Sequence, residues 1–450
     1  MKFAEETEAF ETKVRDIFKD ISRHRTADFS VEKDEHEIRG FQRAVLDGFK
    51  VGQKKILLEL RQLQEKSKEV QQELKIARQE RNKELVEEIL IKVKTIEYQE
   101  SIFKNLADSI AWQMVNGEHY LYRRLYTGEE GVKDLLDKSF EYVINFSDQV
   151  NADPDAFCLI SDITNNIQLG DCLITDKEGI KVSEIKSGHM NFKALDIIAE
   201  RKLTDDNFDE KKLSDEFDGK FMKQIKRMVV QKGKTDRAAK IVQDHKGPDP
   251  KYKDTTIFIV ENDFTLETYH GDLISLSKQL ETKDWAYTSV GAIVHVGMYK
   301  NDWRIPGQFT LKQLCDPFPF VDLMASRGIL ICEPIFLKPF SEDIIMDIVF
   351  GRMKVYIGID YNNFIKFSND LGVKASWSAP KELQKYLEDY PHDRREIFSF
   401  ENKGIKIEID GNEIFVGHGF FTKILFDHFL PETMILKYNG TMENIGGSEE

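Results

Sequence analysis

The sequence predicts a mixed α/β protein in which a long helical segment precedes a sheet-containing core. The chain has 450 residues, and all 11 prolines lie from Pro154 onward. Residues 1–153 therefore lack the residue that most strongly interrupts a helix. Beyond Pro154 the sequence consists of short apolar runs separated by turn-forming residues. This pattern is typical of strands alternating with helices.

The helical segment carries an apolar seam. Apolar residues recur there at spacings of three and four, the pattern of a helix that buries one stripe against another helix. The seam consists of Ile56, Leu60, Leu63, Val70, Leu74, Ala77, Leu85, Ile89, Val93 and Ile96. A parallel dimer and an antiparallel hairpin within one chain both produce this pattern. We expect residues 1–104 to form a coiled-coil arm that acts as a spacer or joins two copies in a homodimer.

The remainder divides into two further expected domains. Residues 105–300 contain the runs AFCLISDI, IQLGDCLITD and GIKVSEIKSG, then a basic helix over 220–240 and further strands from TTIFIVEND and SVGAIVHVGMY. This order of helix, strands, helix and strand indicates an α/β domain. Residues 301–450 read as a mixed α/β domain, with a hairpin turning at Asp410–Gly411.

Composition restricts the class of protein. The net charge of −15 gives no overall attraction to nucleic acid, so a binding surface for phosphates would have to be local. Four cysteines without metal-ligand spacing form no disulfide framework. The N-terminus carries no apolar signal segment, and no stretch approaches the length of a membrane span. We therefore expect a cytoplasmic protein with no membrane partner.

Residues 170–188 contain the candidate catalytic residues. Asp171 ends or interrupts one expected strand, a tight turn follows at 176–179, and Glu184 and Lys186 lie on the expected return strand. Residues two apart on a strand share a face, so the hairpin brings Asp171 alongside Glu184 and Lys186. Two converging carboxylates beside an ammonium are costly without a compensating ion. Their hard oxygen atoms suit Mg²⁺ or Mn²⁺, which would activate water near a phosphoryl group.

This arrangement resembles the PD-(D/E)xK nuclease superfamily. Gly170-Asp171 is followed by twelve residues and then by Glu184-Ile185-Lys186, with glycine replacing the proline of the first half-motif. The resemblance covers roughly residues 105–300. It implies a restriction-endonuclease-like core, with the arm before it and the mixed region after it. It also implies Asp171, Glu184 and Lys186 as catalytic residues, the two carboxylates being metal ligands.

The resemblance suggests two further site residues. The superfamily often takes an acidic metal ligand from the helix before the first motif strand, for which Glu118 is the first candidate and Asp108 the second. It often places a glutamine on the helix after the second motif, and Gln224 matches in type and place. Each has a plain alternative as an ordinary polar residue on a helix surface.

The basic helix offers a surface for nucleic acid. Residues 219–240 hold eight Lys or Arg and only Asp236 against them. The residues expected to contact phosphates are Lys220, Lys223, Lys226, Arg227 and Lys234. Such a helix would fix the backbone of DNA in register without reading its sequence. The acidic run 205–218 could occupy this surface when no substrate is bound.

The function expected from these features is a metal-dependent endonuclease that hydrolyses phosphodiester bonds, most simply in DNA. The known uses of the superfamily make defence of a bacterium against phage a plausible setting by analogy. Two alternatives stay open. The chain could bind nucleic acid as a sensor without cutting it, or act as a coiled-coil scaffold in which Glu184 and Lys186 form an ordinary exposed pair.

Overall fold

The computed structural model describes residues 2–22, 35–115, 119–126, 134–186, 189–214, 216–244, 246–249, 256–258, 266–326, 331–390, 397–409 and 411–436. They fall into two compact units, Met1–Ile259 and Val260–Glu450. Glu118, Asp410 and the C-terminal tail lie outside the described residues. Among the helices described, none combines the length and the apolar composition needed to cross a lipid bilayer.

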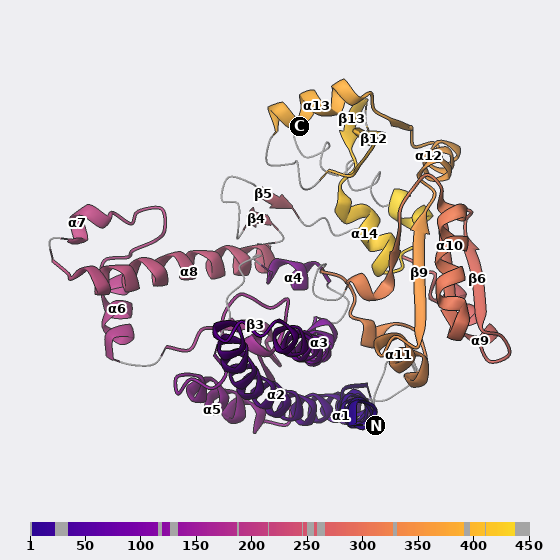
Figure 1. Ribbon diagram of the computed structural model, residues 1–450. Coiled ribbons are helices and arrows are strands. Elements are labelled where there is room, and N and C mark those ends of the chain that lie inside the picture. The colour runs from indigo at the N-terminus through magenta and orange to yellow at the C-terminus, as the bar shows by residue number, and fades with distance from the viewer. Residues whose placement is uncertain are drawn as a thin grey trace. The chain divides into compact units, whose positions relative to one another are not determined.

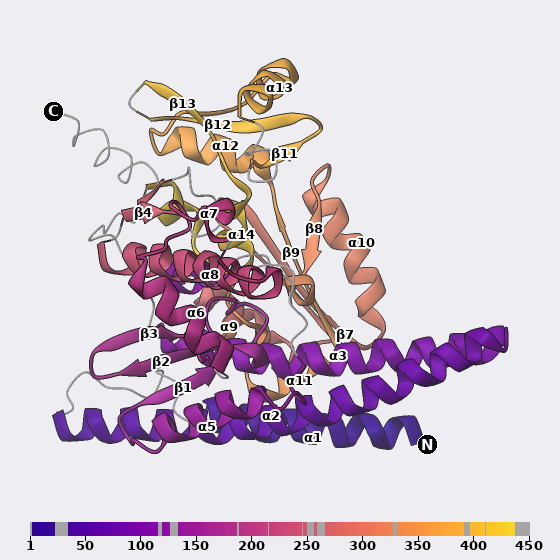
Figure 2. The same ribbon diagram turned by 90° about the vertical axis from the view of Figure 1, so that its left-hand side faces the viewer.

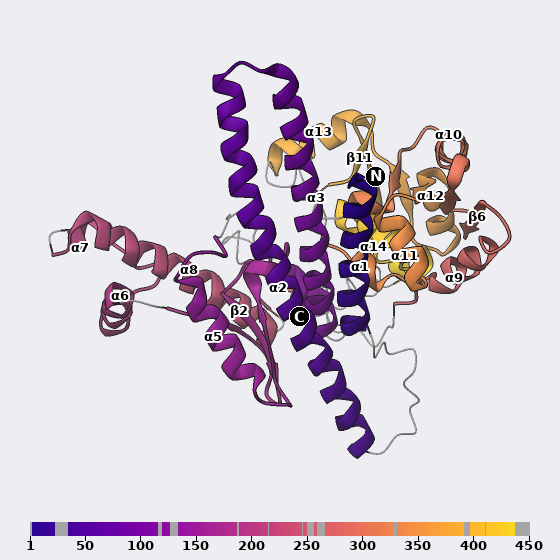
Figure 3. The same cartoon turned by 60° about the horizontal axis from the view of Figure 1, so that its bottom comes forward.

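Three long helices begin the first unit: α1 (Lys2–Ser22), α2 (Glu35–Gln79) and α3 (Lys83–Met114). Helices α2 and α3 lie antiparallel and side by side (Figure 3). The seam residues that are buried are Ile56, Leu60, Leu63, Val70, Leu74, Ala77, Ile89 and Ile96. Each buried Leu or Ile stabilises the packed state by about 1.5–3 kcal/mol. The apolar spacing therefore predicted the buried face of the arm.

The turn between α2 and α3 decides between the two arrangements that the sequence left open. Arg81 adopts a φ of 57°, and the side chain of Asn82 caps α3 by accepting a hydrogen bond from the backbone N–H of Leu85 at 3.1 Å. The chain thus folds back on itself, and the seam is filled by residues of the same chain. A homodimer, which we expected to use this seam, would need another surface.

The central sheet of the first unit is a short antiparallel meander. Its strands are β1 (Phe157–Ile160), β2 (Cys172–Asp176) and β3 (Gly179–Ser183), in the order β1-β2-β3. Helix α5 (Phe140–Asn151) packs against β1 (Figure 2). Helix α4 (His119–Arg124) and the 3-10 turn η2 (Ser161–Ile163) complete this part.

The arm is part of the same compact unit as the meander. The buried side chain of Gln53 on α2 donates to the carbonyl of Cys158 at 3.0 Å and accepts from the backbone N–H of Ile160 at 2.9 Å. These bonds satisfy backbone groups of β1 that face the arm. The expected boundary at residue 104 falls inside one compact unit, because α2 contacts β1 and both α2 and α3 contact η2.

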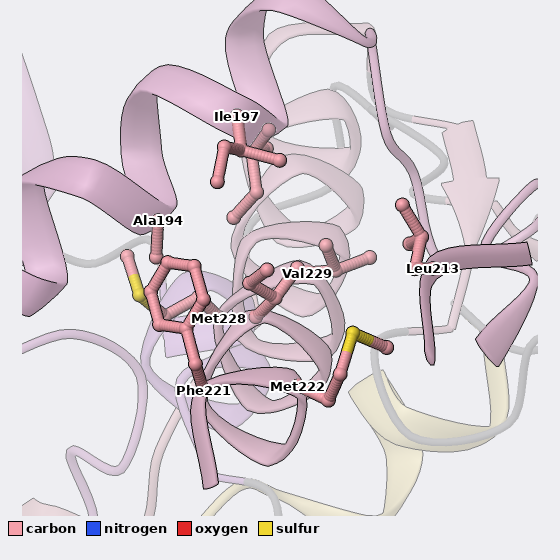
Figure 4. Packing of buried hydrophobic residues seen from close by; sticks show 9 residues of the cluster. Ala194, Ile197, Leu213, Phe221, Met222, Met228 and Val229 are labelled. Atoms are coloured by element: carbon pink, nitrogen blue, oxygen red, sulfur yellow. The ribbon is translucent and has the colours of Figure 1, made fainter. Parts of the chain in front are cut away.

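A helical layer follows the meander. It consists of α6 (His189–Glu200), α7 (Glu210–Ser214) and α8 (Gly219–Asp244), and α8 runs as one long helix (Figure 1). Helices α6 and α8 pack through a cluster that includes Ala194, Ile197, Phe221, Met228 and Val229, and Leu213 of α7 joins it (Figure 4). Strands β4 (Lys246–Pro248) and β5 (Thr256–Phe258) pair antiparallel after α8.

The second unit has two sheets. Its elements are α9 (His270–Gln279), β6 (Trp285–Val290), β7 (Val294–Lys300), η3 (Asn301–Trp303), α10 (Arg304–Cys315), β8 (Phe320–Asp322), η4 (Leu323–Ser326), η5 (Ile335–Leu337), α11 (Glu342–Val349), β9 (Met353–Ile359), α12 (Tyr361–Asp370), β10 (Ala375–Trp377), α13 (Pro380–Asp389), β11 (Ser399–Phe400), β12 (Lys403–Ile409), β13 (Asn412–Phe415) and α14 (His418–Phe426). One sheet has the order β6-β7-β9-β8, and in the other β10-β12-β11 is joined by β13 on β12.

The pairing in this unit moves the second expected boundary. The SVGAIVHVGMY segment, which we placed in the 105–300 domain, supplies β7, and β7 pairs along its whole length with β9. That pairing ties residues 285–300 to the C-terminal unit, so the division lies near residue 260 rather than at 300. Ile409 pairs with Asn412 across the expected hairpin turn.

Candidate active site

The turn between β2 and β3 forms where the sequence predicts it. Asp176 pairs with Gly179, and its Oδ1 accepts a hydrogen bond from the backbone N–H of Glu178 at 2.8 Å. Gly179 adopts a φ of 106°, a conformation that residues with a side chain rarely take. The turn sets the register in which Cys172 opposes Ser183, and so it fixes which residues meet at the open end of the hairpin.

Gly170 permits the close approach of the chain at that open end. Its φ is 72°, and a Cβ atom there would lie 2.4 Å from Cγ1 of Val182. The next residue, Asp171, extends the ladder: its backbone N–H donates to the carbonyl of Ser183 at 2.8 Å, and its carbonyl accepts from Ser161 at 2.9 Å. Glycine is therefore the residue that fits this position without displacing Val182 or Ser183.

The carboxylate of Asp171 lies against the second half of the motif. Its Oδ2 accepts a hydrogen bond from the backbone N–H of Ile185 at 2.7 Å. Ile185 is the residue between Glu184 and Lys186, so the hairpin brings the predicted carboxylate to the middle of the Glu-Ile-Lys segment. After a substitution at residue 171, the N–H of Ile185 stays paired only if the new side chain also carries an acceptor there.

Glu184 and Lys186 form a close ion pair that a third residue completes. Nζ of Lys186 lies 2.5 Å from Oε1 of Glu184 and donates to Oε1 of Gln231 at 3.1 Å. Nε2 of Gln231 in turn donates to Oε1 of Glu184 at 2.6 Å. The side chains of Lys186 and Glu184 are 15% and 22% exposed, so water reaches the pair without fully solvating it.

The backbone around this pair differs from the expectation in one respect. We placed Glu184 and Lys186 on the return strand, but β3 ends at Ser183. Asp171 directly precedes β2, and its backbone bonds to Ser183 in the expected register. The ladder ends there, so Glu184, Ile185 and Lys186 lie outside the sheet. The side chains of Glu184 and Lys186 still lie side by side because they form an ion pair.

Gln224 is not part of this constellation. Its amide donates a hydrogen bond to Oδ1 of Asn191 on α6. The glutamine that contacts the motif is Gln231, seven residues and about two helical turns further along α8. Residues seven apart lie close to one face of a helix, so Gln231 is on the side of α8 that carries Gln224, and of these two glutamines Gln231 contacts the motif. The packing of α8 on α6 sets the position of Gln231.

The two candidates for an additional acidic ligand have different outcomes. Glu118 lies outside the described residues. Asp108 is fully buried on α3 and accepts hydrogen bonds from the backbone N–H groups of Asn165 and Asn166, at 3.0 and 3.1 Å. Burial raises its pKa to about 6. Asp108 thus anchors the loop between η2 and β2 rather than contacting Lys186 or Glu184.

The basic residues of α8 are distributed over an exposed surface. Lys220, Lys223, Lys226 and Arg227 are exposed, and Lys234 is half-buried. Part of the basic charge is already paired with the preceding acidic run: Lys226 contacts Glu210 at 2.6 Å, and Arg237 contacts Asp205 at 2.6 Å. Asp205, Arg237 and Lys240 are among the residues that line a cavity of about 310 Å³.

The oxygen atoms of this site are carboxylate and amide oxygens, the donors that suit Mg²⁺ or Mn²⁺ in proteins. Asp171 contacts the backbone of Ile185, whereas Oε1 of Glu184 and Oε1 of Gln231 both contact the ammonium of Lys186. The site therefore combines acidic oxygen donors with a cationic side chain.

Comparisons of this chain with protein-family models, with curated proteins and with solved structures gave no match.

Proposed function

We propose that the chain is a metal-dependent nuclease whose active site is built on the β2–β3 hairpin. The observation that carries the proposal is the 2.7 Å hydrogen bond from the backbone N–H of Ile185 to Oδ2 of Asp171, because it brings the first acidic residue to the Glu184-Ile185-Lys186 segment. We further propose that this part of the first unit is a restriction-endonuclease-like core.

The proposed roles follow from the contacts. Asp171 and Glu184 would hold Mg²⁺ or Mn²⁺, which would polarise the scissile phosphate and acidify a water molecule. Lys186 would orient that water, take its proton or stabilise charge on the phosphate. Gln231 touches both members of the Glu184–Lys186 pair, so it would hold the ammonium in a fixed position while Glu184 turns toward the cation.

The proposed substrate is DNA, supported by the charge of α8. Lys220, Lys223 and Arg227 are exposed on the helix that also supplies Gln231. A basic helix whose middle contacts Glu184 and Lys186 through Gln231 would contact the phosphate backbone and leave the bases unread. This surface is local, which makes it compatible with a chain whose overall charge is −15.

A plasmid-nicking assay with Mg²⁺ or Mn²⁺ tests the proposal. Asp171→Asn keeps an acceptor for the backbone of Ile185 but removes the charge, and Lys186→Met removes the ammonium. Both should reduce metal-dependent cutting by at least about 10²-fold, the scale of losing a general base or charge-stabilising group. The matched control is Lys181→Met, because Lys181 is an exposed lysine on the adjoining strand β3, where it pairs with the turn residues Asp176 and Glu178.

The same samples separate the two alternative functions. A mobility shift of duplex DNA without cutting by the wild-type chain would favour a non-catalytic binder. Neither a shift nor cutting would favour a scaffold. If both substitutions cut as well as the wild type, the hairpin carries no catalysis and the proposal is wrong.

A further inference from the structure

Three potential metal ligands converge in the second unit, away from the hairpin site in sequence. They are His270 at the start of α9, Glu333 just before η5, and His428 just after α14. One ligand atom of each lies within 4.8 Å of the other two. The trio is the only group of this kind within the described ranges, and no local motif in the sequence joins its members.

Backbone hydrogen bonds hold the three segments together. The N–H of Tyr269 donates to the carbonyl of His428 at 2.9 Å, which fixes His270 beside His428. The N–H of Glu333 donates to Oδ1 of Asp427 at 2.9 Å, which fixes Glu333 beside the same segment. These bonds do not involve the three side chains, so the fold itself brings the ligand atoms together.

The ring of His428 is buried without polar partners. Its exposed fraction is 0%, and among the described residues neither of its ring nitrogens has a hydrogen-bond partner. Nε2 of His270 is likewise buried without one, and the two rings lie edge to face with centroids 5.4 Å apart. Buried polar nitrogens are normally satisfied, and one that is not requires an explanation such as an ion.

The protonation of both rings is compatible with binding a cation. Burial, and secondarily the charge of Lys338, lowers the pKa of His270 to about 4 and that of His428 well below its usual value. Both imidazoles are therefore neutral at pH 7. Neutral imidazole is the form that binds a metal.

Lys338 restricts which ion fits. Its ammonium is fully buried, lies 3.1 Å from Oε2 of Glu333 and donates to the carbonyl of Phe426. A cation held only by electrostatic attraction to one carboxylate would be repelled by this ammonium. An ion that forms strong bonds with two imidazole nitrogens has a compensating interaction, which favours a transition metal over Mg²⁺ or Ca²⁺.

We propose that His270, Glu333 and His428 form a binding site for Zn²⁺. Two imidazoles and one carboxylate are an established ligand set for this ion, with a fourth position left for water. At Zn²⁺ bond lengths of about 2.0–2.2 Å, tetrahedral ligand atoms lie about 3.3–3.6 Å apart. The distances between the three ligand atoms would therefore shorten by up to about 1.5 Å on binding.

The ion would connect three segments that are far apart in the chain. His270 begins α9, Glu333 precedes η5 and His428 follows α14, and the backbone bonds described above also join these segments. Because a metal bound only by the folded chain stabilises that fold, Zn²⁺ would raise the stability of the second unit. The site uses none of the hairpin residues, so it is independent of the proposed nuclease function.

Metal analysis of the full chain tests the site. After chelation and reloading with Zn²⁺, the wild type should retain one equivalent more than His428→Gln and Glu333→Gln. Co²⁺ in place of Zn²⁺ should give a visible absorption band that both variants lose. Two controls should keep this equivalent of Zn²⁺: His418→Gln, which alters another histidine of the same unit, and Asp148→Asn, which alters an exposed aspartate of the first unit.

Thermal unfolding supplies the second readout. Zn²⁺ should raise the Tm of the wild type and of both controls, and should leave the Tm of the two ligand variants unchanged. Circular dichroism establishes that each variant is folded, and Glu333→Gln serves if His428→Gln fails to fold, because the side chain of Glu333 is 15% exposed. A wild type that retains no Zn²⁺, or ligand variants that retain as much as it does, would overturn the proposal.

Discussion

The side-chain amide of Gln231 donates to Oε1 of Glu184 at 2.6 Å across 47 residues of sequence, and its oxygen accepts from Lys186 at 3.1 Å. One residue of α8 thus contacts both members of the ion pair at the hairpin.

Replacing Gln231 should therefore impair catalysis if the hairpin is an active site. Gln231→Leu removes both bonds and should lower the rate of metal-dependent nicking by about 10–100-fold, the range for residues that orient a ligand through hydrogen bonds. The measurement is the nicking rate of plasmid DNA at saturating Mn²⁺.

The matched control is Gln224→Leu, two turns away on the same helix. Its partner is Asn191 and not the motif, so the rate should stay within about twofold of the wild type. If the two variants are equally impaired, Gln231 acts through the stability of α8 and not through Lys186.

Gly170 should tolerate alanine less well than Gly179. Both have a positive φ, but a Cβ at residue 170 meets Val182 at 2.4 Å and the carbonyl of Ser183 at 2.8 Å, whereas nothing lies within 4 Å at residue 179. Gly170→Ala should thus lose about 1–3 kcal/mol more free energy of unfolding than Gly179→Ala, the usual cost of overpacking.

Urea unfolding of the two variants measures this difference. Gly170→Ala should also lose nicking activity, because the displaced chain carries Asp171. Equal losses of stability would mean that the approach of residue 170 to Val182 does not constrain the hairpin.

Asp108 should make stability depend on pH in the acidic range. Its pKa is about 6 in the folded chain, raised by burial from an ordinary value near 4. Between these values the folded state binds more protons than the unfolded state, so stability falls as the pH rises from about 4 to 6. The contribution lost is about 3 kcal/mol and stays absent at pH 7.

The free energy of unfolding of Asp108→Asn, measured from pH 4 to 7, checks this sign. The free energy of unfolding of the variant should fall less steeply with rising pH than that of the wild type, whatever its absolute value. Asp148→Asn, which alters an exposed aspartate of the same unit, should keep the wild-type slope. An unchanged slope in Asp108→Asn would rule out this residue as the titrating group.

The acidic run should weaken DNA binding through its ion pair with α8. Glu210 holds Lys226 at 2.6 Å, and both side chains are more than half exposed. Glu210→Gln would release the lysine for a phosphate contact. The slope of log Kobs against log salt should then steepen by about one, as expected for one added contact.

Fluorescence anisotropy of a labelled duplex at several salt concentrations measures this slope. Glu408→Gln is the control, because it removes the same charge from an exposed pair with Lys374 in the second unit. A substitution is preferable to deletion of 205–218, since that deletion would also remove Leu213 from the core beneath α8. Equal slopes for both variants would exclude the acidic run as a competitor for this surface.

The local pattern of residues was sufficient to predict much of the fold. The spacing of residues such as Leu60 and Val70 predicted the buried seam of the arm, and Asp176 and Gly179 marked the hairpin turn. These predictions succeed because a helix repeats every 3.6 residues and a strand every two, so burial along one element can be read from the order of its residues.

The sequence by itself determined the hairpin turn and the approach of Asp171 to the Glu184-Ile185-Lys186 segment, because the hairpin joins these residues within one short stretch. Tertiary packing decided the rest. It selected Gln231 over Gln224, used Asp108 as a loop anchor, and brought β7 into the second unit. It also assembled His270, Glu333 and His428 from segments with no common periodicity. Contacts across long loops depend on how whole faces pack, and no local repeat in the chain encodes that.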